Sequence, residues 1–262
     1  MTLDKMSPVS RAFAPWIKHF AGPEGQPLRG ATVVFPHAGG AAASYRKLGI
    51  AFSEVRDTFV VQYPRRAERL RHPAPQTVHE LARGLFDAGP WRDVAPLRLF
   101  GHSMGAVVAF EFARIAEQRH VAVKKLWVSA GPVPSTVANM PNLPTSDKEL
   151  LADLADLGGT DPRLLADEEF AELLTTAARA DYQAFNRYDC GPGVRIRADI
   201  HVICGRDDHR IDVGSLRRWA DHTHGAFRLS FFDGGHFYVN EHINTLAHQI
   251  DTRANRVPTD AS

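Results

Sequence analysis

Cysteine is scarce in this chain: Cys190 and Cys204 are the two cysteines among 262 residues. Two cysteines are too few for a disulfide framework, and neither a CxxC motif nor a Cys/His cluster with ligand spacing is present. We therefore expect no metal site. So little cysteine is typical of a reducing compartment, and we expect a cytoplasmic protein.

An excess of charge of either sign is also missing. The chain has 31 Lys and Arg against 30 Asp and Glu, a net charge of +1. This balance removes the long-range field of a nucleic-acid-binding protein, so we expect no nucleic-acid partner. No apolar run approaches the roughly 18 residues of a membrane-spanning helix, and no apolar core follows the first five residues. We therefore expect neither a membrane partner nor a secretory signal.

What the sequence does contain is a regular alternation of two kinds of segment. Short β-branched or apolar runs alternate with stretches in which apolar residues recur at helical spacing. Strands separated by helices of this length predict an α/β fold with a mostly parallel sheet covered on both faces. We expect one domain over residues 1–262, with loose ends at about 1–12 and 253–262. The predicted strands are 31–35, 58–63, 97–100, 125–129, 200–204 and 227–232, and the helices are 44–55, 77–86 and 106–118.

One long segment, about residues 132–190, interrupts the alternation. It opens with several prolines and contains no convincing strand. A Ser-x-x-Glu capping box at Ser146 and Glu149 predicts one helix, and a second helix is expected from near Asp167 to Phe185. We interpret the segment as an inserted helical lid that covers and gates an active site. The alternative is a set of helices that only pack on the sheet.

The sharpest motif is GHSMG at residues 101–105. It matches G-x-S-x-G and lies between a predicted strand and a predicted helix, as the nucleophile turn of α/β-hydrolases requires. Ser103 is expected at positive φ, with Gly101 and Gly105 leaving room for the neighbouring backbone. The motif predicts that Ser103 is a nucleophile. Ser129 also ends a strand, but no helix follows it, and we interpret it as structural.

A serine nucleophile needs a base, and the base needs an orienting carboxylate. In α/β-hydrolases the chain order is serine, acid, histidine, and the histidine follows the last strand. His236 has this position, because it lies in the turn after residues 227–232. Asp207 and Asp208 both follow the strand at 200–204, and sequence reasoning alone does not choose between them.

Acyl transfer also needs two N–H donors for the tetrahedral oxygen. One is expected from Met104, the residue after the nucleophile. The second is expected from the PHAGG segment at residues 36–40, with Ala38 as the favoured donor. A simple glycine turn is the alternative interpretation of that segment.

Taken together, these motifs resemble those of the type II thioesterases, which are stand-alone α/β-hydrolases associated with nonribosomal peptide and polyketide synthases. The resemblance spans roughly residues 31 to 245. It implies that Ser103 is the nucleophile, His236 the general base and acid, and Asp208 the orienting carboxylate. It also implies an oxyanion hole at Ala38 and Met104 and substrate contacts at His37 and Phe237. The matching motifs are FPHAGG at 35–40, QYP at 62–64, FGHSMG at 100–105, RAD at 179–181, Gly205 with Asp208, and GGHFY at 234–238.

The resemblance further implies the substrate, an acyl group held as a thioester on the phosphopantetheine arm of a carrier protein. The expected role is removal of stalled or aberrant acyl groups from the synthase, with no cofactor. The carrier protein is the expected partner, and the chain is expected to act as a monomer. One alternative is a general acyl-CoA thioesterase or carboxylesterase with the same triad. Another is a catalytically silent protein that docks on a synthetase.

Two positions depart from the family pattern. Arg65 stands where the family commonly has glycine, and it opens a basic stretch over residues 65–71. This stretch would meet the phosphate of the arm or an acidic carrier surface, or it is a solvated loop. Arg206 stands where an acidic residue is frequent, which keeps Asp207 open as the acid.

Overall fold

A seven-stranded sheet forms the centre of the described residues, 7–23 and 30–251 of this computed structural model. The strand order is β1-β3-β2-β4-β5-β6-β7. β1 pairs with β3 antiparallel, and every other neighbouring pair is parallel. The strands are β1 (Ile17–Phe20), β2 (Ala31–Phe35), β3 (Thr58–Val61), β4 (Leu97–His102), β5 (Val123–Ser129), β6 (Asp199–Gly205) and β7 (Phe227–Phe232).

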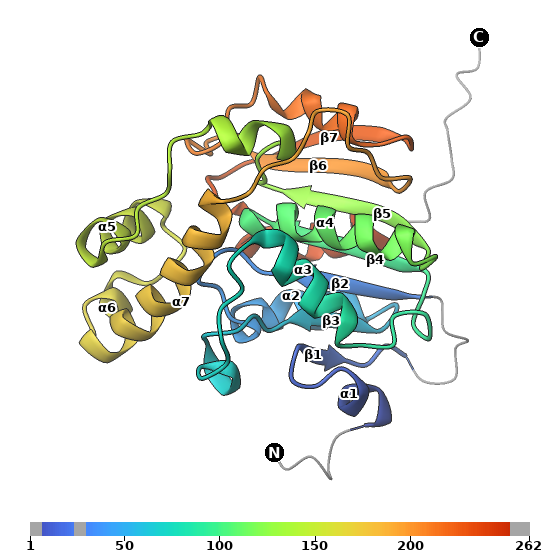
Figure 1. The fold of residues 1–262 in the computed structure, drawn as a ribbon, viewed down its shortest axis with the longest axis horizontal. Coiled ribbons are helices and arrows are strands. Elements are labelled where there is room, and N and C mark those ends of the chain that lie inside the picture. Colours follow the sequence, from blue (N-terminus) through green and yellow to red (C-terminus); the bar gives the residue numbers. More distant parts are fainter. Residues whose placement is uncertain (1–6, 24–29, 252–262) are drawn as a thin grey trace.

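Helices cover both faces of this sheet, as the alternation predicts. α3 and α4 pack together on one face, and α2 and α8 pack together on the other (Figure 1). The helices are α1 (Pro8–Ala12), α2 (Arg46–Ser53), α3 (Val78–Asp87), α4 (Met104–Gln118), α5 (Asp147–Leu157), α6 (Pro162–Leu165), α7 (Glu168–Asn186) and α8 (Ile243–Asp251). Short 3-10 helices lie at Ala42–Tyr45, Ala67–Arg69, Pro134–Asn139, Leu216–His222 and Tyr238–Asn240.

Side-chain alternation along the central strands builds two hydrophobic clusters. In β2, Val33 and Phe35 belong to the cluster under α3 and α4, whereas Val34 belongs to the cluster under α2 and α8. All five residues of β2 are buried. Successive strand residues point to opposite faces, so a strand covered on both sides is a continuous apolar run.

The six predicted strands are all present, with ends that differ by at most two residues from those expected. β1 was not predicted. Its four residues, IKHF, include Lys18 and His19, and such a short edge strand carries little periodic signal. Of the expected loose ends, residues 8–12 form α1, while residues 1–6 and 253–262 lie outside the described residues.

The segment between β5 and β6 contains α5, α6 and α7, which lie together beyond the carboxyl edge of the sheet (Figure 1). Asp167 caps α7 by accepting the N–H of Phe170 at 2.8 Å. The predicted capping box of α5 forms only in part. Ser146 Oγ donates to the Glu149 carboxylate at 2.5 Å, but its side chain accepts no backbone N–H. We refer to residues 132–190 below as the helical insertion.

Candidate active site

Ser103 lies in the tight turn between β4 and α4. Its φ is 56° and its ψ is −125°, a strained conformation for a residue with a side chain. The turn is held by its N–H, which donates to the Ser129 carbonyl at 2.8 Å. α4 begins at the next residue, Met104, so its first N–H groups face the same region as the hydroxyl. The predicted positive φ is confirmed.

The two glycines of the turn are required by close backbone contacts. A Cβ on Gly101 would lie 2.3 Å from the Gly105 carbonyl oxygen. A Cβ on Gly105 would lie 2.2 Å from the carbonyl oxygen of Phe35, in β2. Backbone atoms cannot move away cheaply, so any larger residue would separate β2, β4 and α4.

His236 and Asp208 form a buried hydrogen-bonded pair. The Nδ1 of His236 and the Oδ2 of Asp208 are 2.9 Å apart, and each residue is 5% exposed. Because a carboxylate only accepts, Nδ1 donates and Nε2 remains as the basic nitrogen. Asp207 is exposed, and it is held through its own backbone N–H, which donates to Gly234 at 3.0 Å. Of the two aspartates left open above, Asp208 is the one that contacts the histidine.

Asp208 is ionised despite its burial. Burial alone would raise its pKa, but the hydrogen bond and charge of His236 and the N–H of Arg210 bring that pKa below its ordinary value. The Sγ of Cys204 lies 3.7 Å from the same carboxylate. Burial, followed by the Asp208 charge, raises the pKa of the Cys204 thiol to about 12, so this thiol stays protonated.

Ser103 and His236 line one cavity of about 100 Å³. Ala38 and Met104, the residues expected to stabilise the oxyanion, line it too. The structure therefore brings together the nucleophile, the base and both oxyanion residues that the sequence predicts. The remaining wall is mainly apolar and is contributed largely by the helical insertion, but it also includes the polar side chains of Asp153, Tyr182 and Arg210. Its apolar residues are Pro132, Met140, Leu143, Leu157, Phe185 and Ile211.

The N–H groups of Ala38 and Met104 are available to a ligand. Within residues 7–23 and 30–251, neither N–H has a hydrogen-bond partner. Met104 is the first residue of α4, where the helix itself offers no acceptor. Both residues are buried, at 8% and 3% exposed. Two unpaired N–H donors beside a serine hydroxyl are the arrangement that stabilises a tetrahedral oxyanion.

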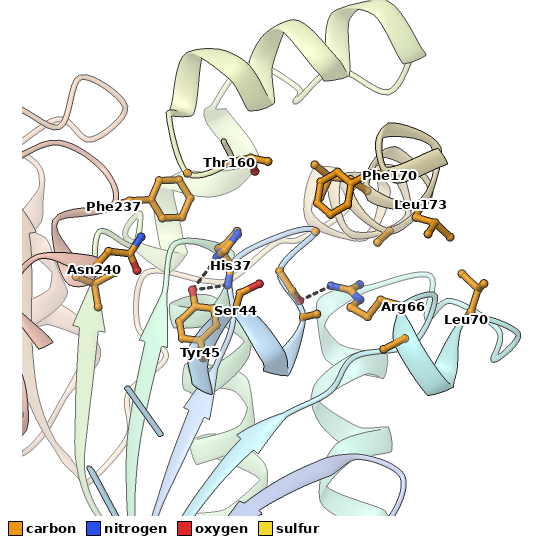
Figure 2. Close-up of a pocket in the computed structure, with 18 residues that line it drawn as sticks. His37, Ser44, Tyr45, Arg66, Leu70, Thr160, Phe170, Leu173, Phe237 and Asn240 are labelled. Carbon is orange, nitrogen blue, oxygen red and sulfur yellow. Dashed lines mark hydrogen bonds between the residues drawn. The ribbon is translucent and has the colours of Figure 1, made fainter. Parts of the chain in front are cut away.

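His37 is held as a neutral donor at the edge of this cavity. Its backbone N–H donates to the Tyr45 hydroxyl at 3.1 Å, and its Nδ1 lies 2.7 Å from the same oxygen (Figure 2). Burial, then the charges of His236 and Arg66, lowers the pKa of His37 to about 3. Burial raises the pKa of Tyr45, so the hydroxyl keeps its proton. The hydroxyl accepts from the His37 backbone N–H, and among the described residues Nδ1 is the acceptor within reach of its proton. The remaining proton of His37 is therefore on Nε2.

A second cavity, of about 300 Å³, lies on the other side of His37 and Phe237, which line both cavities. The two rings meet edge to face, with centroids 4.8 Å apart. Figure 2 shows Phe170 and Leu173 of α7 on one side of this second cavity and Arg66 and Leu70 below them. The sequence identified His37 and Phe237 as substrate contacts, and their shared position between the cavities is compatible with that role.

Gly159, in the helical insertion, packs directly on the Phe237 ring. A Cβ at this glycine would lie 2.2 Å from the ring. The ring between the two cavities therefore rests on the turn between α5 and α6.

A buried polar chain lies behind the site. The Nδ1 of His102 lies 2.9 Å from Ser129 Oγ, which lies 2.7 Å from the Tyr238 hydroxyl. All three residues are buried, and burial lowers the pKa of His102 well below its ordinary value. Both contacts of Ser129 are to protein groups, which supports the structural interpretation of this serine.

Two arginines of the basic stretch at residues 65–71 are buried rather than solvated. Arg66 and Arg69 are 5% and 3% exposed and bind protein groups. Arg69 donates to the Gln62 carbonyl at 2.7 Å, and its guanidinium stacks 3.6 Å from the Trp16 ring. The interpretation as a solvated loop is therefore wrong for these two arginines, and contact of the stretch with a phosphate or a carrier surface stays a prediction.

Sequence reasoning assigned no role to Tyr45 or Asp181, although both contact the PHAGG segment. Asp181 is in the RAD motif, which was the available signal. In the parts of the chain that the structure describes, no helix is long and apolar enough to cross a bilayer. The same residues contain no group of three or more His, Cys, Asp or Glu arranged to hold a metal ion.

Comparison with known proteins is consistent with this geometry. Residues 32–254 match the family model described as a thioesterase domain. The chain is 35% identical over 237 residues to the thioesterase PikA5 of Streptomyces venezuelae, covering 90% of this chain and 84% of that protein. It is 56% identical over 245 residues to the phenyloxazoline synthase MbtB of Mycobacterium tuberculosis. That match covers 93% of this chain but spans only 17% of the synthase.

Among solved structures, the type II thioesterase BorB from the borrelidin biosynthetic cluster has a TM-score of 0.76 and 37% identity. The match covers 90% of this chain and 96% of that one. The predicted α/β-hydrolase fold is thereby confirmed.

Proposed function

Because the chain belongs to the thioesterase family, we propose that it hydrolyses acyl groups held as thioesters on the phosphopantetheine arm of a carrier protein. The carrier would belong to a nonribosomal peptide or polyketide synthase, and hydrolysis would clear stalled or wrongly loaded acyl groups. The observation that carries the proposal is the His236–Asp208 pair beside Ser103, in a cavity with two unpaired N–H donors.

In the proposed acylation step, Nε2 of His236 accepts the hydroxyl proton of Ser103 while Oγ attacks the thioester carbonyl. The tetrahedral oxygen is stabilised by the N–H groups of Ala38 and Met104. Asp208 holds Nδ1–H in place and stabilises the imidazolium. The C–S bond then breaks, and the leaving sulfur takes the proton from His236. The products are the acyl-serine and the free pantetheine thiol.

The proposed deacylation step repeats this chemistry with water. His236 accepts a proton from water, the resulting hydroxide attacks the acyl-serine, and the Ser103 oxygen leaves with the proton returned from His236. A thiol is a good leaving group, so access and selection of the substrate are more demanding than breaking the thioester bond. The helical insertion would act as the lid that admits the arm and selects the acyl group.

The two cavities offer a place for each part of the substrate. The apolar cavity beside Ser103 suits the acyl chain, and the larger cavity beyond Phe237 suits the arm. The Nε2–H of His37 would donate to a carbonyl of the substrate at the junction. One chain carries every residue of this site, so we propose that the enzyme acts as a monomer. Light scattering of the purified chain would test this oligomeric state. We also propose that it acts in the cytoplasm.

The similarity to a phenyloxazoline synthase favours one acyl class within this proposal. The acyl cavity is walled by the aromatic side chains of Tyr182, Phe185 and Phe237. We propose that aryl-containing acyl groups are hydrolysed faster than straight chains of similar length.

Acyl release from a loaded carrier, followed by intact-protein mass spectrometry, tests the proposal. One carrier is loaded with aryl and alkyl acyl-phosphopantetheine groups, and the matching acyl-CoAs are run in parallel. We expect faster release from the carrier than from CoA, and no release by Ser103→Ala, which removes the nucleophile. Equal or faster hydrolysis of acyl-CoA would instead indicate a general acyl-CoA thioesterase. Activity that survives in Ser103→Ala would exclude this serine as the nucleophile.

A further inference from the structure

The loop that carries the Ala38 N–H is tied to the helical insertion by a buried hydrogen bond. Gly39, the next residue, donates its N–H to the Asp181 carboxylate at 2.8 Å. Asp181 lies in α7, 142 positions further along the chain. One residue therefore connects the expected oxyanion hole with the lid segment.

Arg66 completes the attachment from the other side. Its guanidinium donates to the second oxygen of Asp181 at 2.7 Å. It also donates to the Gly40 carbonyl at 3.0 Å, the bond drawn at Arg66 in Figure 2. A third donation, to the Pro64 carbonyl at 2.9 Å, fixes the guanidinium itself. The two side chains, which we call the Asp181–Arg66 clamp, thus hold the N–H of one glycine and the carbonyl of the next.

The charges of the clamp balance where water cannot screen them. The side chains of Arg66 and Asp181 are 5% and 8% exposed. A lone buried carboxylate near an oxyanion hole would oppose the negative charge of the transition state. Paired with Arg66, Asp181 can accept from Gly39 without adding net negative charge at the site.

The same loop packs on one face of α7. Gly39 has a φ of 78°, and a Cβ there would lie 3.2 Å from the Ala178 Cβ and 3.3 Å from Leu174. Leu174, Ala178 and Asp181 lie four and three residues apart, which puts them on one side of the helix. The packing against Leu174 and Ala178 and the hydrogen bond to Asp181 therefore all hold Gly39 against α7.

We propose that Asp181 is a positioning residue for catalysis: through Gly39 it fixes the Ala38 N–H in the oxyanion hole, so the hole is assembled only when α7 is seated. This inference rests on the proposed function, because it assigns a role within the same site. An N–H donor stabilises the transition state only when it is correctly aimed, and a displacement of about 1 Å is enough to lose much of that effect.

The test compares Asp181→Ala, Asp181→Asn and the wild type. Hydrolysis of p-nitrophenyl butyrate gives kcat and KM, and an alkyl trifluoromethyl ketone, which forms a charged tetrahedral adduct with serine, reports on the oxyanion hole. We expect kcat to fall about 100-fold in Asp181→Ala with KM within about threefold of wild type. Affinity for the ketone should fall by a similar factor. Asp181→Asn keeps an acceptor for Gly39 and should recover part of both losses.

Glu111→Gln is the matched control. Glu111 is also a buried carboxylate, 2% exposed, and it binds Arg114 and Tyr188 away from the oxyanion loop. This variant should lose stability but keep the kcat and ketone affinity of wild type per folded molecule.

Several results would overturn the proposal. It fails if activity in Asp181→Ala falls only with the folded fraction, if KM rises at constant kcat, or if ketone affinity is unchanged. If Asp181→Ala does not fold, Asp181→Asn with wild-type kcat and ketone affinity overturns it equally. Ester and ketone results do not depend on the natural substrate. If the Asp181 variants show these effects but the wild type does not hydrolyse carrier-bound thioesters, the proposed function is wrong and the positioning role of Asp181 still holds. A wild type inert to both probes would overturn both.

Discussion

The carboxyl edge of the sheet and the helical insertion both line the cavity at Ser103, but they are buried to different degrees. The last four residues of β4 and of β5 are buried, and the turns that follow carry the serine and hold its backbone. In the insertion, α6 has no buried residue and α5 has only Leu150 and Leu154. In α7 the first buried residue is Thr175.

This difference assigns separate tasks to the two regions. Groups that need accurate placement are attached to the sheet, where packing is dense and displacement is costly. The insertion supplies apolar wall and is anchored mainly through the second half of α7, where Asp181 lies. In the first half of the insertion, Asp153 of α5 binds the Arg210 guanidinium, and the Arg210 N–H donates to Asp208, so this contact must be kept. α6 and the first turns of α7 have no buried residue and can vary in sequence with less effect on the triad, so selectivity can change while the chemistry is retained.

The largest effect is expected on the sheet side, at the acid. Asp208→Asn should lower kcat about 10⁴-fold, because an amide cannot hold His236 in the tautomer with a basic Nε2. KM should change little, since Asp208 does not line either cavity described above. Steady-state kinetics of the variant give both values. Asp207→Asn is the control, and a comparable loss in that variant would contradict the assignment of the acid.

The next effect concerns stability of the nucleophile turn. Gly105→Ala should destabilise the fold by about 3 kcal/mol, because its methyl group would meet two backbone carbonyl oxygens, of Phe35 and Pro36, within 2.4 Å. Urea unfolding measures the loss. Gly193→Ala is the matched control, since a Cβ there meets no atom within 4 Å. Equal stability of the two variants would show that the turn is less tightly packed than described.

Acid should destabilise the sheet through His201, a buried histidine of β6. Burial, followed by the charges of Arg228 and Lys125, lowers the pKa of His201, in β6, from 6.5 to about 4. The unfolded chain therefore binds the proton more readily between these values, and stability falls as pH drops below about 6.5. At pH 5 the loss from His201 is about 2 kcal/mol.

Urea unfolding at pH 7 and pH 5 checks this loss. His201→Gln should reduce the difference between the two pH values, whereas His248→Gln, at an exposed position of α8, should not. Parallel pH dependence in wild type and His201→Gln would be the contrary result. His37 and His102, whose pKa values are also lowered, act in the same direction and remain in both variants.

The smallest effect is expected in the insertion. Gly159→Ala should cost about 1 kcal/mol of stability, because the Phe237 ring or the turn must shift to make room for the methyl group. It should change the ratio of kcat/KM for short and long acyl groups by up to about tenfold, since that ring lies between the cavities. Competition between two acyl thioesters measures the ratio. Gly193→Ala, where a Cβ meets no atom within 4 Å and φ is not positive, is the control for a methyl group that contacts nothing.

What could be predicted from the sequence also differs between the sheet with its turns and the contacts made by the helical insertion. The strands and the GHSMG turn are local patterns, so their positions were predicted to within two residues, and the motif order located His236. The choice between Asp207 and Asp208 depends on which side chain turns inward, which a strand end does not encode. The clamp joins residues 115 positions apart, and no periodic pattern signals a pairing between Arg66 and Asp181. Likewise, Arg66 and Arg69 look solvated in sequence because burial of an arginine depends on distant acceptors.

The two buried thiols have a practical consequence for studying this chain. Cys190 and Cys204 are 6% and 0% exposed, and burial raises the pKa of both. Disulfide reagents react with exposed thiolates, so the folded protein should give almost no colour with a chromogenic aromatic disulfide. Thiol released from a thioester would then be read continuously against a silent background, and a slow rise of that background would report unfolding in the same cuvette.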